Sequence, residues 1–174
     1  MTEDLRYPIG EFNKNVVATP ALRAEYIKTI LALHDNLAGA VSGLNERQLD
    51  TPYRPDGWTI RQTIHHVADS HLNSFIRFKL ALTENAPTIR PYFEDRWAEL
   101  ADSKMPIDVS MKIIQGIHLR WATLLMAMTE EDFKRELIHP ESGVWTLEKT
   151  LALYDWHGRH HTAHITNLRA RNNW

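Results

Sequence analysis

Residues 58–83 are WTIRQTIHHVADSHLNSFIRFKLALT, and this stretch decides the fold class. Thr59 and Gln62 have the spacing of a capping box, in which the two residues satisfy each other's backbone N–H groups at a helix start. Apolar residues then cluster near one direction on a wheel turned by 100° per residue: Ile60, Ile64, Val67, Phe75 and Phe78. Pro87 prevents the helix from continuing far beyond this stretch. We therefore predict an amphipathic helix over residues 60–83.

Three further segments have helical signals. Thr19-Pro20 pairs an N-cap hydroxyl with proline at the first helical position, which predicts a helix over about 20–42. Asp108 is the expected N-cap of a helix whose apolar stripe reaches Met128. His139-Pro140 through Gly143 break the pattern, and the last helix is expected to start at Thr146.

The arrangement of these segments predicts an all-α fold. Four amphipathic segments of about 22–26 residues match the helix lengths of four-helix bundles, and no window alternates long enough to predict a strand. Residues 44–58 are expected to be a loop, and residues 84–107 a long connection with one short helix near 94–100. Because these connections are long, they permit a crossover topology as well as a simple up-down order. We predict a single four-helix bundle domain over residues 1–174.

Composition excludes several functional classes. The sequence contains 20 Lys and Arg residues and 22 Asp and Glu residues. The resulting net charge of −2 produces no strong field that would attract nucleic acid or an anionic membrane. The longest uninterrupted apolar run, residues 124–128, is far shorter than the ~20 residues of a membrane span. The start, MTEDLRYPIG, lacks the cationic and apolar regions of a secretory signal, so we expect a cytoplasmic protein. There is no cysteine, and any metal must bind nitrogen and oxygen.

Histidines are the strongest functional signal. Seven of the ten fall within residues 65–71 and 157–164, where about one would fall by chance. On the predicted last helix, His157, His160, His161 and His164 lie within one arc of about 100°, on the apolar face. His157 and His161 are nearest its centre, with the i, i+4 spacing that two-histidine metal sites use on helices. Because four inward imidazoles need partners for their ring nitrogens, this pattern predicts a metal site.

A further ligand must come from another helix. The 60–83 segment offers His65, His66 and His71, and periodicity alone does not choose among them. His66 lies on a polar stripe, His71 on the apolar face and His65 between them. The isolated residues His34 and His118 are instead expected to be hydrogen-bonded core histidines.

Weaker candidates surround the histidines. Trp58 and Trp145 are expected to anchor helix starts. Four residues are candidates to orient a ligand or serve as a base: Asp69, Ser70, Asp155 and Thr162. Four arginines near the 60–83 helix are candidates to hold a carboxylate: Arg54, Arg61, Arg77 and Arg90.

Three stretches carry a resemblance to a known family: YPIGEF (7–12), QLDTPYRPDGWTIRQTIHHVADSHLNSFIRFKLALTENAPTIRPY (48–92) and LYDWHGRHHTAHITNL (153–168). They resemble the DinB superfamily of four-helix metalloproteins, in its YfiT-like branch of metal-dependent hydrolases. The resemblance implies that His66, His157 and His161 hold the metal, usually zinc or nickel, in an intracellular homodimer with mixed topology. Many members have glutamine where this chain has His164, which makes His164 a candidate fourth ligand or orienting group.

The histidine pattern and the family resemblance are compatible with three functions. The first is a hydrolase with Zn²⁺ as the expected ion and Ni²⁺ or Mn²⁺ as alternatives, acting on a small-molecule substrate through activated water. Its catalytic base is not identified by the sequence. The second, implied by related superfamily members, is a metal-dependent S-transferase that uses a low-molecular-weight thiol such as bacillithiol. The third is a non-enzymatic binding protein with a closed, structural metal site.

Overall fold

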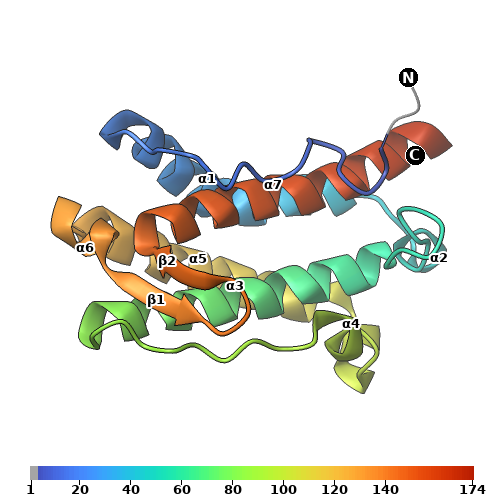
Figure 1. Cartoon of the computed structure of the whole chain (residues 1–174). Coiled ribbons are helices and arrows are strands. Elements are labelled where there is room, and N and C mark those ends of the chain that lie inside the picture. Colours follow the sequence, from blue (N-terminus) through green and yellow to red (C-terminus); the bar gives the residue numbers. More distant parts are fainter. Residues whose placement is uncertain (1–3) are drawn as a thin grey trace.

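The computed structural model describes residues 4–174, and four long helices dominate it (Figure 1). They are α1 (Pro20–Val41), α3 (Ile60–Thr83), α5 (Ile107–Ala127) and α7 (Leu147–Asn172). The four predicted helices are therefore confirmed, with boundaries close to those expected. No helix within residues 4–174 combines the length and apolar character needed to cross a lipid bilayer.

Local capping chemistry sets most helix starts. The Thr19 hydroxyl accepts a hydrogen bond from the Leu22 N–H, and Thr59 forms the predicted capping box with Gln62. The expected N-cap at Asp108 is wrong. Pro106 is the N-cap residue and makes no side-chain hydrogen bond. Asp108 lies in the first turn of α5, where its negative charge interacts favourably with the positive end of the helix dipole.

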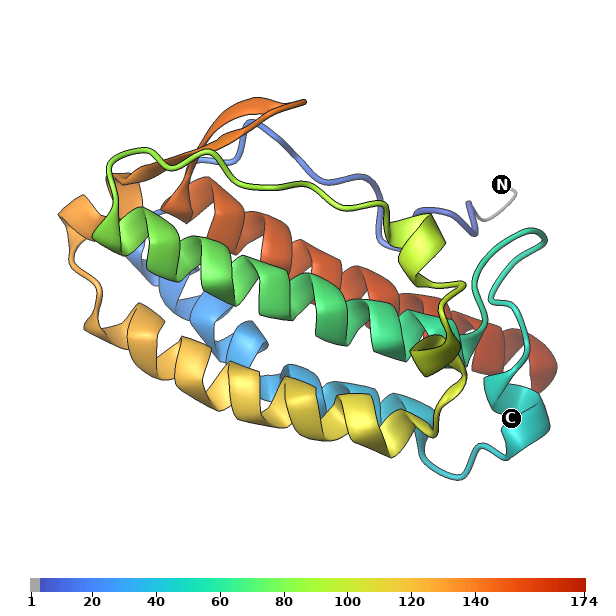
Figure 2. The same ribbon diagram turned by 90° about the horizontal axis from the view of Figure 1, so that it is seen from below.

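The bundle has a crossover topology. Around its axis the order of neighbouring helices is α1, α5, α3, α7, so the consecutive helices α1 and α3 are diagonal to each other. Parallel α1 and α7 are joined near their starts by Arg23–Glu148 and near their ends by Arg169–Ala40. Figure 2 shows α3 and α5 also running in one direction, with residues 84–106 returning along the length of the bundle. The long connections thus produce a topology other than simple up-down.

Short elements occupy these connections. They are α2 (Glu46–Leu49), α4 (Glu94–Trp97), a 3₁₀ helix η1 (Ala101–Lys104), α6 (Glu130–Lys134), β1 (Glu136–His139) and β2 (Gly143–Thr146). The prediction of a loop over 44–58 is wrong for Glu46–Leu49, because Asn45 and Gln48 form a capping box that starts α2.

A β-hairpin was not expected from the sequence. β1 and β2 pair antiparallel, and Ile138 of β1 also exchanges backbone hydrogen bonds with residues 87–89 of the crossover. Each strand has only four residues, too few for an alternating pattern to appear. The hairpin ties the crossover segment to the start of α7.

Two apolar clusters fill the bundle, one toward each end. The first is centred on Phe78, Trp121 and Leu151, and the second on Leu37, Ile64 and Ile165. A polar layer separates them on three helices, formed by Ser70 and His71 of α3, His118 of α5 and residues 157–164 of α7. The histidines therefore lie at mid-length in the bundle, between two dry cores.

Candidate metal centre

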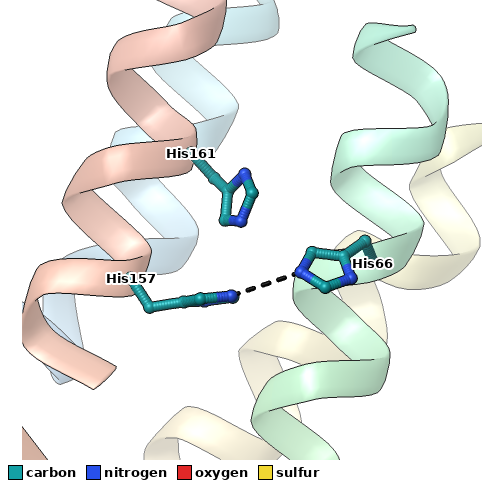
Figure 3. Close-up of side chains that lie close together, drawn as sticks. All are labelled: His66, His157 and His161. Carbon is teal, nitrogen blue, oxygen red and sulfur yellow. Dashed lines mark hydrogen bonds between the residues drawn. The ribbon is translucent and has the colours of Figure 1, made fainter. Parts of the chain in front are cut away.

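Three histidines from two helices converge at one side of this polar layer. Figure 3 shows the rings of His157 and His161, one turn apart on α7, facing His66 on α3. Their ligand nitrogens all lie within 4.8 Å of one another. His161 is buried, whereas His66 and His157 are partly exposed. The predicted i, i+4 pair and one histidine of the other window thus lie in a single cluster.

The spacing of the nitrogens suits a metal ion. His66 Nε2 lies 3.2 Å from His157 Nε2. Two nitrogens at 2.0–2.1 Å from a tetrahedral zinc ion would be separated by roughly 3.3 Å. His161 completes the set, because one of its ring nitrogens lies within 4.8 Å of the ligand nitrogens of His66 and His157. The three side chains therefore fit a divalent cation without a large rearrangement.

Burial keeps these imidazoles neutral. Desolvation, aided by the nearby His160, lowers the pKa of His66 to about 4. Burial also holds the pKa values of His157 and His161 well below the ordinary value, and repulsion from neighbouring histidines acts in the same direction. A neutral imidazole is the form that binds a metal ion, so the site presents its ligands in the required state.

The other two histidines of α3 have different surroundings. His65 is buried away from the cluster, with Nδ1 at 2.7 Å from Ser110 Oγ and Nε2 at 3.0 Å from the Met105 carbonyl. His71 is fully buried and bonds to His157 and His118. The interpretation of His118 as a hydrogen-bonded core histidine is confirmed, whereas His34 is only half-buried beside Asp35.

His160 and His164 form a second grouping with His161 along α7. Their ligand nitrogens also lie within 4.8 Å of one another, and the Nδ1 atoms of all three are buried without a hydrogen-bond partner in the described chain. His164 Nε2 donates to the Arg6 carbonyl at 3.2 Å, and its ring stacks on Tyr53. His164 therefore lies beside the cluster of His66, His157 and His161 rather than within it.

A cavity of about 530 Å³ opens onto the three converging histidines. Two of the four arginines that are candidates to hold a carboxylate, Arg54 and Arg77, line it, and Arg54 Nε is buried without a partner among the described residues. Arg61 is instead held by Glu46 and Asp50 in ion pairs outside this cavity. The walls thus offer cationic groups near the histidines.

Aromatic side chains form much of the remaining wall. Trp58 anchors the start of α3, as expected, and its ring also lies 4.4 Å from that of His66. The Tyr154 hydroxyl lies 3.3 Å from Ser70 Oγ, and both residues face the cavity. Burial raises the pKa of Tyr92 well above its ordinary value, so this phenol stays protonated.

The other predicted orienting groups are engaged elsewhere. Asp155 is buried and accepts a 2.6 Å hydrogen bond from Arg159, while Thr162 donates to the Gly158 carbonyl. Neither residue lines the cavity, and neither does Asp69, although burial raises the pKa of Asp69 to about 6. Of the four, only Ser70 reaches the cavity.

Several residues that line the cavity were not predicted from the sequence. Arg6 and Tyr7 precede α1, and Tyr53 and Tyr92 lie in connections, where helical periodicity gives no information. Tyr7, Tyr53 and Tyr92 lie in the stretches that carry the family resemblance, whereas Arg6 lies just before the first of them.

Comparison with known proteins shows the family of this chain. The DinB superfamily model matches residues 30–165. The chain is 53% identical over 172 residues to a protein of Bacillus mycoides named "Putative metal-dependent hydrolase", with 99% of each chain covered. A Bacillus cereus protein of the same name is 53% identical over 171 residues, covering 98% of this chain and 99% of the other.

A solved structure gives the same result for the fold. YfiT from Bacillus subtilis, described as "a probable metal-dependent hydrolase with an unusual four-helix bundle topology", superposes with a TM-score of 0.95 at 46% identity. The match covers 98% of each chain. The resemblance to YfiT-like proteins is therefore confirmed.

Proposed function

This chain belongs to the DinB superfamily, and from that premise we propose that it is a metal-dependent hydrolase whose divalent cation is held by His66, His157 and His161. The observation that carries the proposal is the convergence of three neutral imidazoles from α3 and α7 beside a cavity of about 530 Å³. Three protein ligands are typical of catalytic zinc sites, which keep a position for water or substrate. Zn²⁺ is the ion we propose, with Ni²⁺ and Mn²⁺ as alternatives to be tested.

A bound divalent cation supplies Lewis acidity, which polarises an electrophilic oxygen and lowers the pKa of a coordinated water to about 7. The chain itself provides the rest of the site. Its two apolar clusters exclude water from both sides of the histidine layer. The protonated phenol of Tyr92 is available as a hydrogen-bond donor to a substrate in the cavity.

The test compares the metal-free protein with samples loaded with Zn²⁺, Ni²⁺ or Mn²⁺, assayed on carboxylic esters, amides and phosphoesters. We expect one tightly bound ion per chain, and hydrolysis that disappears in His161→Ala. His34→Ala is the control, because His34 lies outside the cavity. A wild-type protein that binds no metal, or hydrolysis that persists after chelation, would contradict the proposal.

The arginines favour one alternative within the same site. Arg6, Arg54 and Arg77 line the cavity and suit a cosubstrate with carboxylates, as a low-molecular-weight thiol such as bacillithiol would offer. In that S-transferase, the thiol comes from the cosubstrate, since the chain has no cysteine. The cobalt-loaded protein should then develop a sulfur-to-cobalt charge-transfer band when the thiol is added. An unchanged spectrum would exclude this alternative and leave hydrolysis.

A further inference from the structure

A chain of hydrogen bonds crosses all four long helices and ends at the metal centre. His118 Nδ1 on α5 bonds to the carbonyl oxygen of Ile30 on α1. His118 Nε2 lies 3.0 Å from His71 Nδ1 on α3, and His71 Nε2 lies 3.1 Å from His157 Nδ1 on α7. His71 and His118 have only 0% and 1% of their surfaces exposed, so water does not intervene.

The Ile30 carbonyl fixes the donor-to-acceptor direction of these hydrogen bonds. A carbonyl oxygen can only accept, so His118 Nδ1 must carry the proton. In a neutral ring the other nitrogen is then an acceptor, which requires His71 to donate from Nδ1. The same rule makes His71 Nε2 an acceptor, and the donor to it is His157 Nδ1–H. One backbone oxygen thereby determines where the proton lies on three successive rings.

The assignment requires both His118 and His71 to be neutral, because a cation at either ring could donate from both nitrogens and reverse the bonds that follow it. The surroundings meet this requirement. Both rings are buried in the interior beside Trp121, and neither belongs to an ion pair among residues 4–174. Burial lowers the pKa of His118 to about 4 despite the bond to the Ile30 carbonyl.

We propose that His118 and His71 are positioning residues that fix His157 in its Nδ1–H tautomer and so present the Nε2 lone pair to the metal. This inference rests on the proposed function, since it concerns one of the three proposed ligands. The geometry supports it, because His157 Nε2 is the nitrogen that faces His66 at 3.2 Å. Outer partners of this kind orient a ligating ring and raise its basicity.

The tautomers can be observed without any metal. Protein labelled with ¹⁵N in its histidines is examined by long-range ¹H–¹⁵N NMR at pH 7.5 in the presence of a chelator. We expect Nδ1–H on His118, His71 and His157, each assigned by its loss in a single variant. A proton on Nε2 of His157 in the wild type would overturn the inference.

Variants test whether His118 acts through His71. In His118→Phe the His71 Nδ1–H has no acceptor, so we expect His157 to lose its fixed tautomer and Zn²⁺ affinity to fall by ~10-fold or more. His118→Gln should restore both, because its amide oxygen can accept from His71. His65→Phe is the control, since His65 is also buried and makes two hydrogen bonds that are separate from the His118–His71–His157 series. Equal affinities in His118→Phe and His65→Phe would refute the positioning role.

The outcomes separate this inference from the proposed function. Tight metal binding with His157 in the Nε2–H tautomer would preserve the metal site and reject the positioning chain. Three Nδ1–H rings in a protein that takes up no metal would support the tautomer assignment and reject the proposed function. If His118→Phe fails to fold, the wild-type spectrum alone still decides the tautomers.

Discussion

Metal binding should stabilise the fold, and of the three proposed ligands His161 provides the clearest test. His161 is 6% exposed, and its Nδ1 has no hydrogen-bond partner among the described residues. Removing its ring therefore deletes a proposed ligand without breaking a hydrogen bond shown by the structure. The wild type and His161→Ala are each compared with their own metal-free form.

The expected stabilisation by zinc follows from the linkage between metal binding and folding. At free Zn²⁺ equal to 100 times the wild-type Kd, binding stabilises the native state by about 2.7 kcal/mol. For a domain of this size, about 2–4 °C per kcal/mol gives a Tm increase of roughly 5–11 °C. If losing the ligand weakens binding about 100-fold, the same zinc concentration stabilises the variant by only about 0.4 kcal/mol, or roughly 1–2 °C.

The assay is thermal unfolding followed by circular dichroism in a buffered Zn²⁺ series, with chelator as the zero point. His34→Ala should keep the full wild-type increase, because His34 lies on α1 outside the cavity. An equal increase in His161→Ala and the wild type would refute the ligand assignment. An absence of any increase in the wild type would refute the metal site itself.

Four further outcomes are expected. In metal-free protein, the free energy of unfolding should fall as pH drops from 6.5 to about 4, because the unfolded chain binds a proton at His118 that the buried ring does not bind. The loss due to this ring over that range is about 3 kcal/mol. Urea unfolding at pH 7 and 4.5 should show most of it. His164→Ala should keep its metal by elemental analysis, whereas loss of the metal would indicate a closed four-ligand site. Leu37→Ala should cost about 2–5 kcal/mol in urea unfolding with unchanged metal content, since Leu37 is fully buried in the second apolar cluster. Co²⁺ should quench tryptophan fluorescence less in Trp58→Phe than in the wild type, because the Trp58 ring lies 4.4 Å from His66.

Features encoded over three or four residues were predictable from the sequence. Helical periodicity with the start signals at Thr19, Thr59 and Thr146 predicted the long helices, and i, i+4 spacing identified His157 and His161 as neighbours. Periodicity could not choose among His65, His66 and His71, because that choice depends on how α3 is rotated against α7. The family resemblance favoured His66, the α3 histidine that the structure places with the α7 pair.

Features that depend on tertiary contacts were not predictable. The hairpin at Glu136–His139 and Gly143–Thr146 consists of short strands supported by residues 87–89. The bond between His118 and the Ile30 carbonyl joins residues 88 positions apart. The homodimer implied by the resemblance also stays a prediction, which sedimentation velocity would check.

The crossover topology and the proposed positioning chain are connected. The hydrogen bonds pass from Ile30 on α1 to His118 on α5, then to His71 on α3 and His157 on α7. This is the spatial order of the helices around the bundle. In an up-down bundle, α1 would neighbour α3 and lie diagonal to α5, so the first bond would have to cross the core. The long segment 84–106 places α5 between α1 and α3, and that placement lets a backbone oxygen on the first helix determine the tautomer of a proposed ligand on the last.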